Sequence, residues 1–257
     1  METRFPAPDV TFISPIQYDH SDRIHNLRTT VAFLMKYFDT NFIIGENWPT
    51  GVHGTKPGPY PIQYSAHENF HRTKMLNDMT RAAATDIVFN WDADVIVPAP
   101  QVIEAIERLR AGVDVCYPFD GTHECVDRVD AARFWDSLDI ADLAVKRHRN
   151  WNNPTKSVGG CLGYRVSSYW RVGGENENFI SYGPEDSERW HRYRVLGLNV
   201  ARVGGSLYHI EHWKGNDSST SNPFFAANQR EFERIKRLSK EQLQNEIKTW
   251  EWAKQVS

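Results

Sequence analysis

The sequence predicts one α/β domain with a mixed, mainly parallel sheet flanked by helices and a C-terminal helical extension. Its first 45 residues show a strand, helix, strand pattern, which is typical of a βαβ unit with parallel strands. Continuous apolar runs near residues 87 and 115 are typical of strands covered on both faces. The 257 residues, 40% of them hydrophobic and 25% charged, have globular composition and suffice for a large core.

The N-terminal half alternates strands with helices. Ser21 can cap the first helix, whose apolar residues from Ile24 to Phe38 recur at spacings of three and four. The segment 48–64 holds four Pro and three Gly and is expected to be a surface loop. We expect strands at 10–14, 41–45, 86–91 and 113–117, and helices at 21–38, 68–83 and 100–110.

The C-terminal half has a less regular pattern. Residues 119–157 are polar, lose periodicity and are expected to form a partly helical excursion from the sheet. Asn222-Pro223 is typical of a cap followed by the first helical residue, and Ser239 with Gln242 has capping-box spacing. We expect strands at 158–165, 199–203 and 206–210, a helix at 184–196 closed by Gly197, and helices after residue 222.

Composition excludes several classes of protein. The formal charge of −3 argues against a general nucleic-acid binder. The three cysteines are too few for a disulfide framework or a zinc ribbon, so buried thiols are expected. Residues 1–8 lack the apolar core of a signal peptide, and no apolar run approaches the ~20 residues of a membrane span. The sequence therefore predicts a cytoplasmic protein without a transmembrane segment, and it leaves the oligomeric state open.

Asp92-Ala93-Asp94 directly follows the strand expected at 86–91. In an extended chain, residues two apart point to one face, so both carboxylates could hold one hard divalent cation. Alternatively, one could hold the metal and the other a ribose hydroxyl. A solvated turn is the alternative without function. The place at the end of a strand favours the functional interpretation, because ligands gather there in open α/β sheets.

Two further groups carry candidate chemistry. Glu185 and Asp186 begin a predicted helix, where the helix dipole would keep a carboxylate ionised and suited to accept a proton. The alternative is that both acids only stabilise the helix end. His209 and His212 lie at the end of a predicted strand, and either could complete a metal site begun by Asp94. Their alternative is a pair of surface histidines.

Together these motifs resemble the GT-A glycosyltransferases. In chain order they are Phe70-His71-Arg72, Asp92-Ala93-Asp94, Gly159-Gly160-Cys161, Gly183-Pro184-Glu185-Asp186 and the segment around His209. The nearest resemblance is to the β-1,4-galactosyltransferase group and to galactosyltransferase-like domains of bacterial polysaccharide polymerases. It covers roughly residues 9 to 235.

The resemblance implies a role for each motif. It implies that Phe70 and Arg72 contact the nucleotide and that Gly159 and Gly160 line the sugar pocket. It also implies that Asp92 and especially Asp94 bind the donor diphosphate through Mn²⁺ or Mg²⁺, with His209 as a further metal ligand and His212 as the alternative to His209. Finally, it implies that Tyr182, Gly183 and Glu185 bind the acceptor and that Asp186 is the base, assisted by Glu185. Arg23 is a further candidate for the donor phosphates. Tyr182 stands where the group has Trp and Pro184 where it has Gly, which leaves the acceptor open.

The expected activity is that of a metal-dependent inverting glycosyltransferase, using a UDP-sugar and a glycan hydroxyl. A metal neutralises the diphosphate leaving group, and a carboxylate deprotonates the acceptor. A nucleotidyltransferase or phosphohydrolase would need a glycine-rich phosphate loop or an early nucleophilic Asp, and residues 10–17 offer neither. Complete acid and histidine motifs argue against an inactive sugar-binding domain.

We expect one catalytic domain over residues 1–257. Within it, the nucleotide-binding half is 9–118, the variable excursion 119–157, the acceptor and metal half 158–222 and the C-terminal helices 223–257.

Overall fold

The computed structural model describes residues 3–47, 62–65, 69–127, 131–143, 145–149, 157–215 and 219–254. Most of the loop expected at 48–64 lies outside these residues, and so do residues 128–130, 144 and 150–156 of the excursion expected at 119–157. The described end of that loop is a strand, so the expectation of loop up to residue 64 is wrong there.

The main sheet has seven strands, and all neighbouring pairs are parallel except those made by one strand. In spatial order they are β10 (Val200–Arg202), β6 (Val115–Tyr117), β9 (Cys161–Arg165), β4 (Ile87–Trp91), β1 (Phe5–Gln17), β2 (Phe38–Asn47) and β3 (Ile62–Ser65). The exception, β9, runs antiparallel to both β4 and β6. The predicted mixed, mainly parallel sheet is therefore confirmed.

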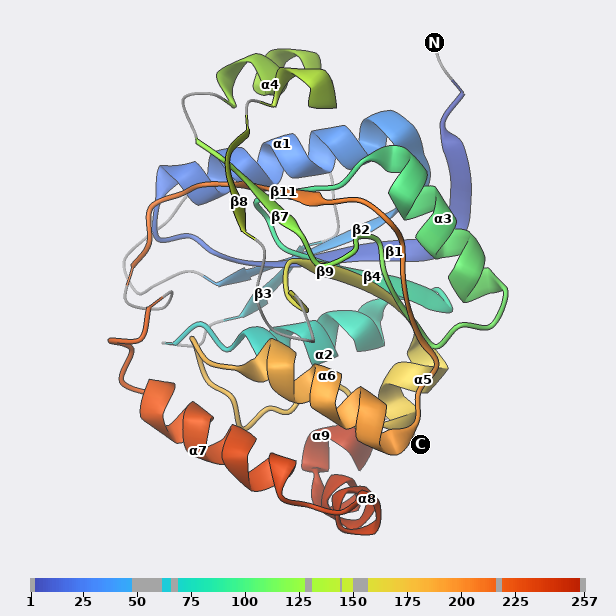
Figure 1. Ribbon diagram of the computed structural model, residues 1–257, viewed down its shortest axis with the longest axis vertical. Helices are drawn as coiled ribbons and strands as arrows, with labels where there is room; N and C mark the ends of the chain where they lie inside the picture. The colour runs from blue at the N-terminus through green and yellow to red at the C-terminus, as the bar shows by residue number, and fades with distance from the viewer. Residues whose placement is uncertain are drawn as a thin grey trace.

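Helices cover both faces of this sheet. They are α1 (Ser21–Tyr37), α2 (Arg72–Ala82), α3 (Ala99–Arg110), α5 (Val166–Arg171) and α6 (Glu185–Leu196). In Figure 1, α1 and α3 lie on one side of the sheet, and α2 and α6 lie on the other. The C-terminal extension consists of α7 (Phe225–Lys236), α8 (Lys240–Thr249) and α9 (Glu251–Lys254), and it packs against α6.

The excursion at 119–157 contains strands that were not predicted from its sequence. β7 (His123–Val126) and β8 (Val145–Arg149) join β5 (Val95–Ile96) and β11 (Leu207–Ile210) in a second sheet of order β5-β11-β7-β8. The short helix α4 (Ala132–Ser137) and the 3-10 turn η1 (Ile140–Asp142) lie between β7 and β8. The prediction of a partly helical excursion is thus incomplete, because β7 pairs with β8 inside the excursion and with β11 far along the chain.

Several element boundaries differ from the expected ones. Phe38 begins β2 rather than ending the first helix, and β1 continues through Pro15 to Gln17. Asn222 does not cap a helix: its side chain accepts from the Phe224 N–H in a turn, and α7 begins only at Phe225. The capping box of Ser239 at the start of α8 is confirmed.

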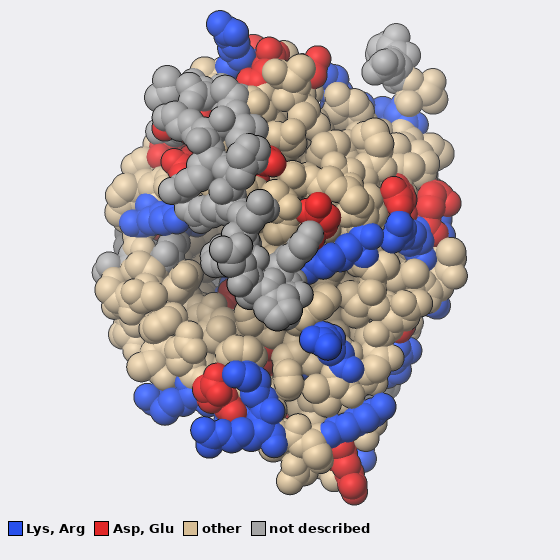
Figure 2. Space-filling view, in the orientation of Figure 1, with Lys and Arg blue, Asp and Glu red and all other residues tan. Residues whose placement is uncertain are grey.

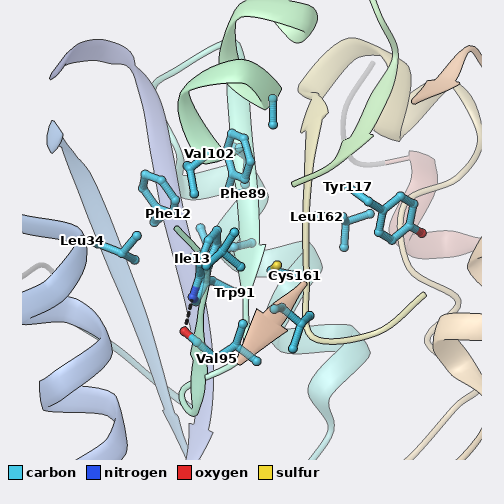
Figure 3. Packing of buried hydrophobic residues seen from close by; sticks show 14 of the residues in the cluster. Phe12, Ile13, Leu34, Phe89, Trp91, Val95, Val102, Tyr117, Cys161 and Leu162 are labelled. Atoms are coloured by element: carbon cyan, nitrogen blue, oxygen red, sulfur yellow. Dashed lines mark hydrogen bonds between the residues drawn. The ribbon is translucent and has the colours of Figure 1, made fainter. Parts of the chain in front are cut away.

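Core packing and one hydrogen bond fix the conformation of the chain just after β4. Phe12, Phe89 and Trp91 pack together, and the Trp91 indole N–H donates to the Val95 carbonyl at 2.8 Å (Figure 3). This bond spans Asp92-Ala93-Asp94 and fixes that segment as a turn. Cys116, Cys125 and Cys161 are buried free thiols, as expected.

Charged side chains of both signs are interspersed on the face shown in Figure 2. Among the described residues, none of the helices combines the length and apolar character needed to cross a membrane.

The close packing of β9 gives a stability prediction. A Cβ on Gly163 would lie 2.5 Å from the Phe89 ring and 2.7 Å from Leu109, so Gly163→Ala should overpack the core. Overpacking costs about 1–3 kcal/mol, and each kcal/mol lowers the melting temperature of a domain this size by about 2–4 °C. Gly204→Ala is the control, because a Cβ there meets nothing within 4 Å. Equal melting temperatures of the two variants would contradict the prediction.

Candidate active site

A cavity of about 510 Å³ opens where β1 and β4 end, and every candidate site residue lines it. These residues are Arg23, Phe70, Arg72, Asp92, Asp94, Gly159, Gly160, Tyr182, Gly183, Glu185, Asp186, His209 and His212. The carboxyl ends of parallel strands are the usual place for a ligand in an open α/β sheet. The structure therefore brings together motifs that are spread over 190 residues of sequence (23 to 212).

The two carboxylates of the Asp-x-Asp motif point to different partners. The segment is a turn, with the Val95 N–H donating to the Asp92 carbonyl at 3.2 Å, so the expected extended geometry is wrong. Asp92 Oδ1 accepts from the Arg72 guanidinium at 2.7 Å. Asp94 Oδ2 lies 2.9 Å from His212 Nε2 and 3.7 Å from His209 Nε2. Within the same cavity, Asp92 thus contacts an arginine, whereas Asp94 contacts the two histidines.

Asp94, His209 and His212 form a cluster that could hold a metal ion. One potential ligand atom from each lies within 4.8 Å of the other two. His209 reaches the cluster because it pairs with Val95 across β11 and β5, one residue after Asp94. His212 follows just beyond the strand, so the structure offers both histidines where the sequence left a choice.

The charge state of this cluster follows from its surroundings. Burial favours the neutral form of Asp94, but His209 and His212 outweigh it and hold the pKa of Asp94 well below its usual range. Burial lowers the pKa of His209. Burial acts in the same direction on His212, but the bond to Asp94 outweighs it and raises the pKa of His212.

On the opposite wall, Asp186 is held by two guanidinium groups. Its Oδ1 accepts from Arg189 Nη2 at 2.7 Å and from Arg72 Nη1 at 3.4 Å. Burial would raise the pKa of Asp186, but Arg189 and Arg72 outweigh burial and lower it. Asp186 is therefore ionised at neutral pH.

Its neighbour Glu185 is in the opposite state. Glu185 Oε2 is buried, and no hydrogen bond from the described part of the chain reaches it. The nearest cation is Arg72, 3.9 Å from Oε1. Burial and the adjacent Asp186 raise the pKa of Glu185 to about 8. Two adjacent carboxyl groups with separated pKa values are the arrangement expected of acid and base partners.

Arg72 connects the two halves of the cavity. It is the first residue of α2, directly after Phe70 and His71, and its side chain is 12% exposed. It contacts Asp92 on one side and Asp186 on the other. The helix expected from residue 68 thus begins four residues later, which leaves Phe70 in the cavity wall.

Glycines allow the backbone to approach the acids closely. A Cβ on Gly159 would lie 2.5 Å from Asp186 Oδ2, and Gly160 has a φ of 91°. A Cβ on Gly183 would lie 2.7 Å from the Asn228 side chain. At the rim, the ring of Tyr182 stacks on Phe225 at 5.8 Å and remains 39% exposed.

Sequence reasoning missed part of the site. The most important omission is Arg189, whose spacing of three from Asp186 on one helix could have indicated the contact. Arg189 lies behind the cavity wall; the lining residues that were not anticipated are Pro15, Ile16, Ala93, His123, Ser157, Val158, Ser181, Pro184, Ser187 and Lys214.

Residues 143–214 match a family model described as the N-terminal domain of galactosyltransferase. The resemblance to galactosyltransferases is confirmed. The matched segment holds Gly159, Gly160, the Glu185–Asp186 pair and both histidines of the metal cluster. Among curated proteins, none matches the chain.

Two solved structures of a Drosophila β-1,4-galactosyltransferase 7 are similar to this chain. One is a mutant in complex with manganese, UDP-Gal and xylobiose, with 16% identity and a TM-score of 0.48. The other is the catalytic domain in complex with xylobiose, with 16% identity and a TM-score of 0.45. Each alignment covers 76% of this chain and 65% of the Drosophila chain.

The raised pKa of Glu185 gives a testable pH dependence. The folded protein keeps a proton on Glu185 up to about pH 8, whereas the unfolded chain releases it near 4.5. Folding therefore binds a proton in this range, and wild-type stability falls as pH rises through it. Glu185→Gln removes this loss, so its melting temperature relative to wild type should rise between pH 5 and pH 9.

Glu241→Gln is the control, since Glu241 is exposed at the start of α8. Its melting temperature relative to wild type should stay level over the same range. A level difference for Glu185→Gln as well would show that Glu185 is ionised in the folded protein.

Proposed function

We propose that the protein is a metal-dependent inverting glycosyltransferase that moves a sugar from a UDP-sugar to a hydroxyl of a glycan. The observation that carries this proposal is the cavity itself, in which a two-histidine, one-aspartate cluster faces a pair of carboxyl groups with Arg72 between them. The family match over residues 143–214 supports it, because that segment holds most of these groups.

The metal cluster fits a divalent cation. Asp94 is ionised and His209 neutral, the forms in which these side chains bind metals. Because Mg²⁺ prefers oxygen ligands throughout, the two imidazoles favour Mn²⁺ over Mg²⁺. When bound, the ion would neutralise the leaving diphosphate. In this proposal Asp94, His209 and His212 would hold the ion, and Asp92 would contact the nucleotide or a water molecule near the ion.

The donor would lie between the metal cluster and Arg72. Phe70 supplies an apolar surface for the nucleotide, and Arg23 and Arg72 supply positive charge to the phosphates. Gly159 leaves room for the sugar, since a side chain there would fill the space beside Asp186, and Gly160 lines the same cavity. In this arrangement the 9–118 half binds the nucleotide and supplies Asp92 and Asp94, and the 158–222 half supplies both histidines, Glu185 and Asp186.

Asp186 would act as the base. It accepts the proton of the acceptor hydroxyl, while the hydroxyl oxygen forms a bond to the anomeric carbon and the bond from that carbon to the diphosphate oxygen breaks. A single displacement of this kind inverts the anomeric configuration. Glu185, protonated at neutral pH, can hydrogen-bond an acceptor hydroxyl, and Tyr182 with Gly183 forms the acceptor rim.

A nucleotide-release assay tests the activity and the base together. With Mn²⁺, a panel of UDP-sugars and a panel of glycan acceptors, we expect UDP release that requires acceptor. Asp186→Asn should lower turnover by about 10²–10⁴-fold with near-normal melting temperature and donor affinity, as expected for loss of a general base.

Asp78→Asn, a change of the same type at a half-buried position on α2 outside the cavity lining, should keep wild-type turnover. Near-normal turnover of Asp186→Asn would move the role of base to another acid. Acceptor-independent UDP release would favour a hydrolase, and no release would favour a binding domain.

Metal binding has its own test. Mn²⁺ should raise the melting temperature of the wild type, and Asp94→Ala, His209→Gln and His212→Gln should each reduce or abolish that rise. His191→Gln is the control, because His191 lies on α6 outside the cavity lining. An undiminished Mn²⁺ effect in the Asp94 variant would exclude this cluster as the metal site.

A further inference from the structure

We propose that Arg189 is a positioning residue that fixes the carboxylate of Asp186 in the orientation required of a base. The inference rests on the proposed function, since it gives Asp186 that role. It adds a residue that does not itself line the cavity.

The side chain of Arg189 is completely buried and makes three hydrogen bonds. Its side chain is 0% exposed, and it donates to Asp186 Oδ1 at 2.7 Å and to Glu175 Oε1 at 2.7 Å. It also donates to the Val158 carbonyl at 3.3 Å. Asp186 is thereby connected to the loop after α5 and to the segment that leads into Gly159. A guanidinium held at three points has little freedom to rotate.

The contacts decide which oxygen of Asp186 is available. Both guanidinium groups, of Arg189 and of Arg72, bond to Oδ1. Within the described residues no hydrogen bond reaches Oδ2, which lies on the side of Gly159. Arg189 therefore leaves Oδ2 to accept the proton beside the expected sugar pocket.

Arg189 is also the steadier of the two guanidinium partners. Arg72 is shared among Asp92, Asp186 and Glu185, and it lines the cavity where donor phosphates would compete for it. Arg189 is completely buried behind Asp186, so a ligand in the cavity cannot reach it. Its bond to Asp186 can persist through binding and reaction, which is what a preorganised base needs.

A second buried ion pair on the same helix provides a matched control. Arg192 is 0% exposed and bonds to Glu188 at 2.9 Å, but its other bonds go to the carbonyls of Val172 and Gly174. No hydrogen bond or ion pair joins it to Asp186. Removal of either pair should affect folding, whereas only the Arg189 pair should affect the base.

The experiment replaces each pair as a unit in the full chain. Arg189→Leu alone would leave Glu175 buried without its cation, so the test variant is Arg189→Leu with Glu175→Leu. The control is Arg192→Leu with Glu188→Leu. Replacing both partners of a buried pair by apolar residues is often tolerated, and melting temperatures verify folding.

The first measurement is a crystal structure of each double variant. In the test variant we expect the Asp186 carboxylate to leave its place beside Gly159, and in the control we expect it to stay. An unmoved carboxylate in the test variant would overturn the proposal. This readout needs no substrate, so it remains decisive even if the proposed transferase activity fails.

The second measurement is turnover with Mn²⁺, UDP-galactose and xylobiose as probes. We expect the test variant to lose about 10–100-fold in kcat, the scale of a misplacement of about 1 Å, with the KM for UDP-galactose changed less than about twofold. The control should lose less than about threefold in kcat. Equal losses in the two variants would show that Arg189 has only a structural role.

Discussion

The structure depends on how the charge of four carboxyl groups around one cavity is balanced. They are those of Asp92, Asp94, Glu185 and Asp186. Ionised together in partly buried surroundings, they would repel one another strongly. Arg72 lies between two of them, Arg189 lies behind Asp186, and two imidazoles lie beside Asp94. The fourth, Glu185, stays protonated because its pKa is raised to about 8. The fold must therefore hold each guanidinium and imidazole group in a fixed place.

The topology of the sheet provides those places. Because β9 runs antiparallel beside β4, it begins at the edge where β4 ends, and the Asp92 N–H donates to the Gly160 carbonyl at 2.8 Å. The glycines before β9 therefore lie between the Asp-x-Asp turn and Asp186. In the second sheet, β5 directly follows Asp94 and pairs with β11, which brings His209 to the same edge. Two strand pairings thus assemble the motifs.

How far the sequence could predict this depended on the range of the interactions. Helices and buried strands follow local periodicity, so the predicted bounds of α3 and β4 agree with the structure to within one residue, and the predicted capping box of α8 is present. The pairing of β7 with β11 joins segments about 80 residues apart and leaves no local pattern, so the sequence does not predict β7. β8 is the edge strand of the same sheet and pairs with β7, so it depends on β7 being in place. The side-chain directions at Asp92 and Asp94 depend on a turn fixed by Trp91, and no rule for extended chains applies to it.

The acid pair shows why an argument from a helix end alone was insufficient. Glu185 and Asp186 both lie in the first turn of α6, so its dipole favours the ionised form of both. Their pKa values nevertheless shift in opposite directions. Burial and the charge of Asp186 raise the pKa of Glu185, whereas Arg189 and Arg72 outweigh the burial of Asp186. Of these two guanidinium groups, Arg189 makes the shorter bond to Asp186, at 2.7 Å. The helix supplies position and a common field, whereas the deeper burial of Glu185 and the guanidinium groups bonded to Asp186 decide which of the two acids is ionised.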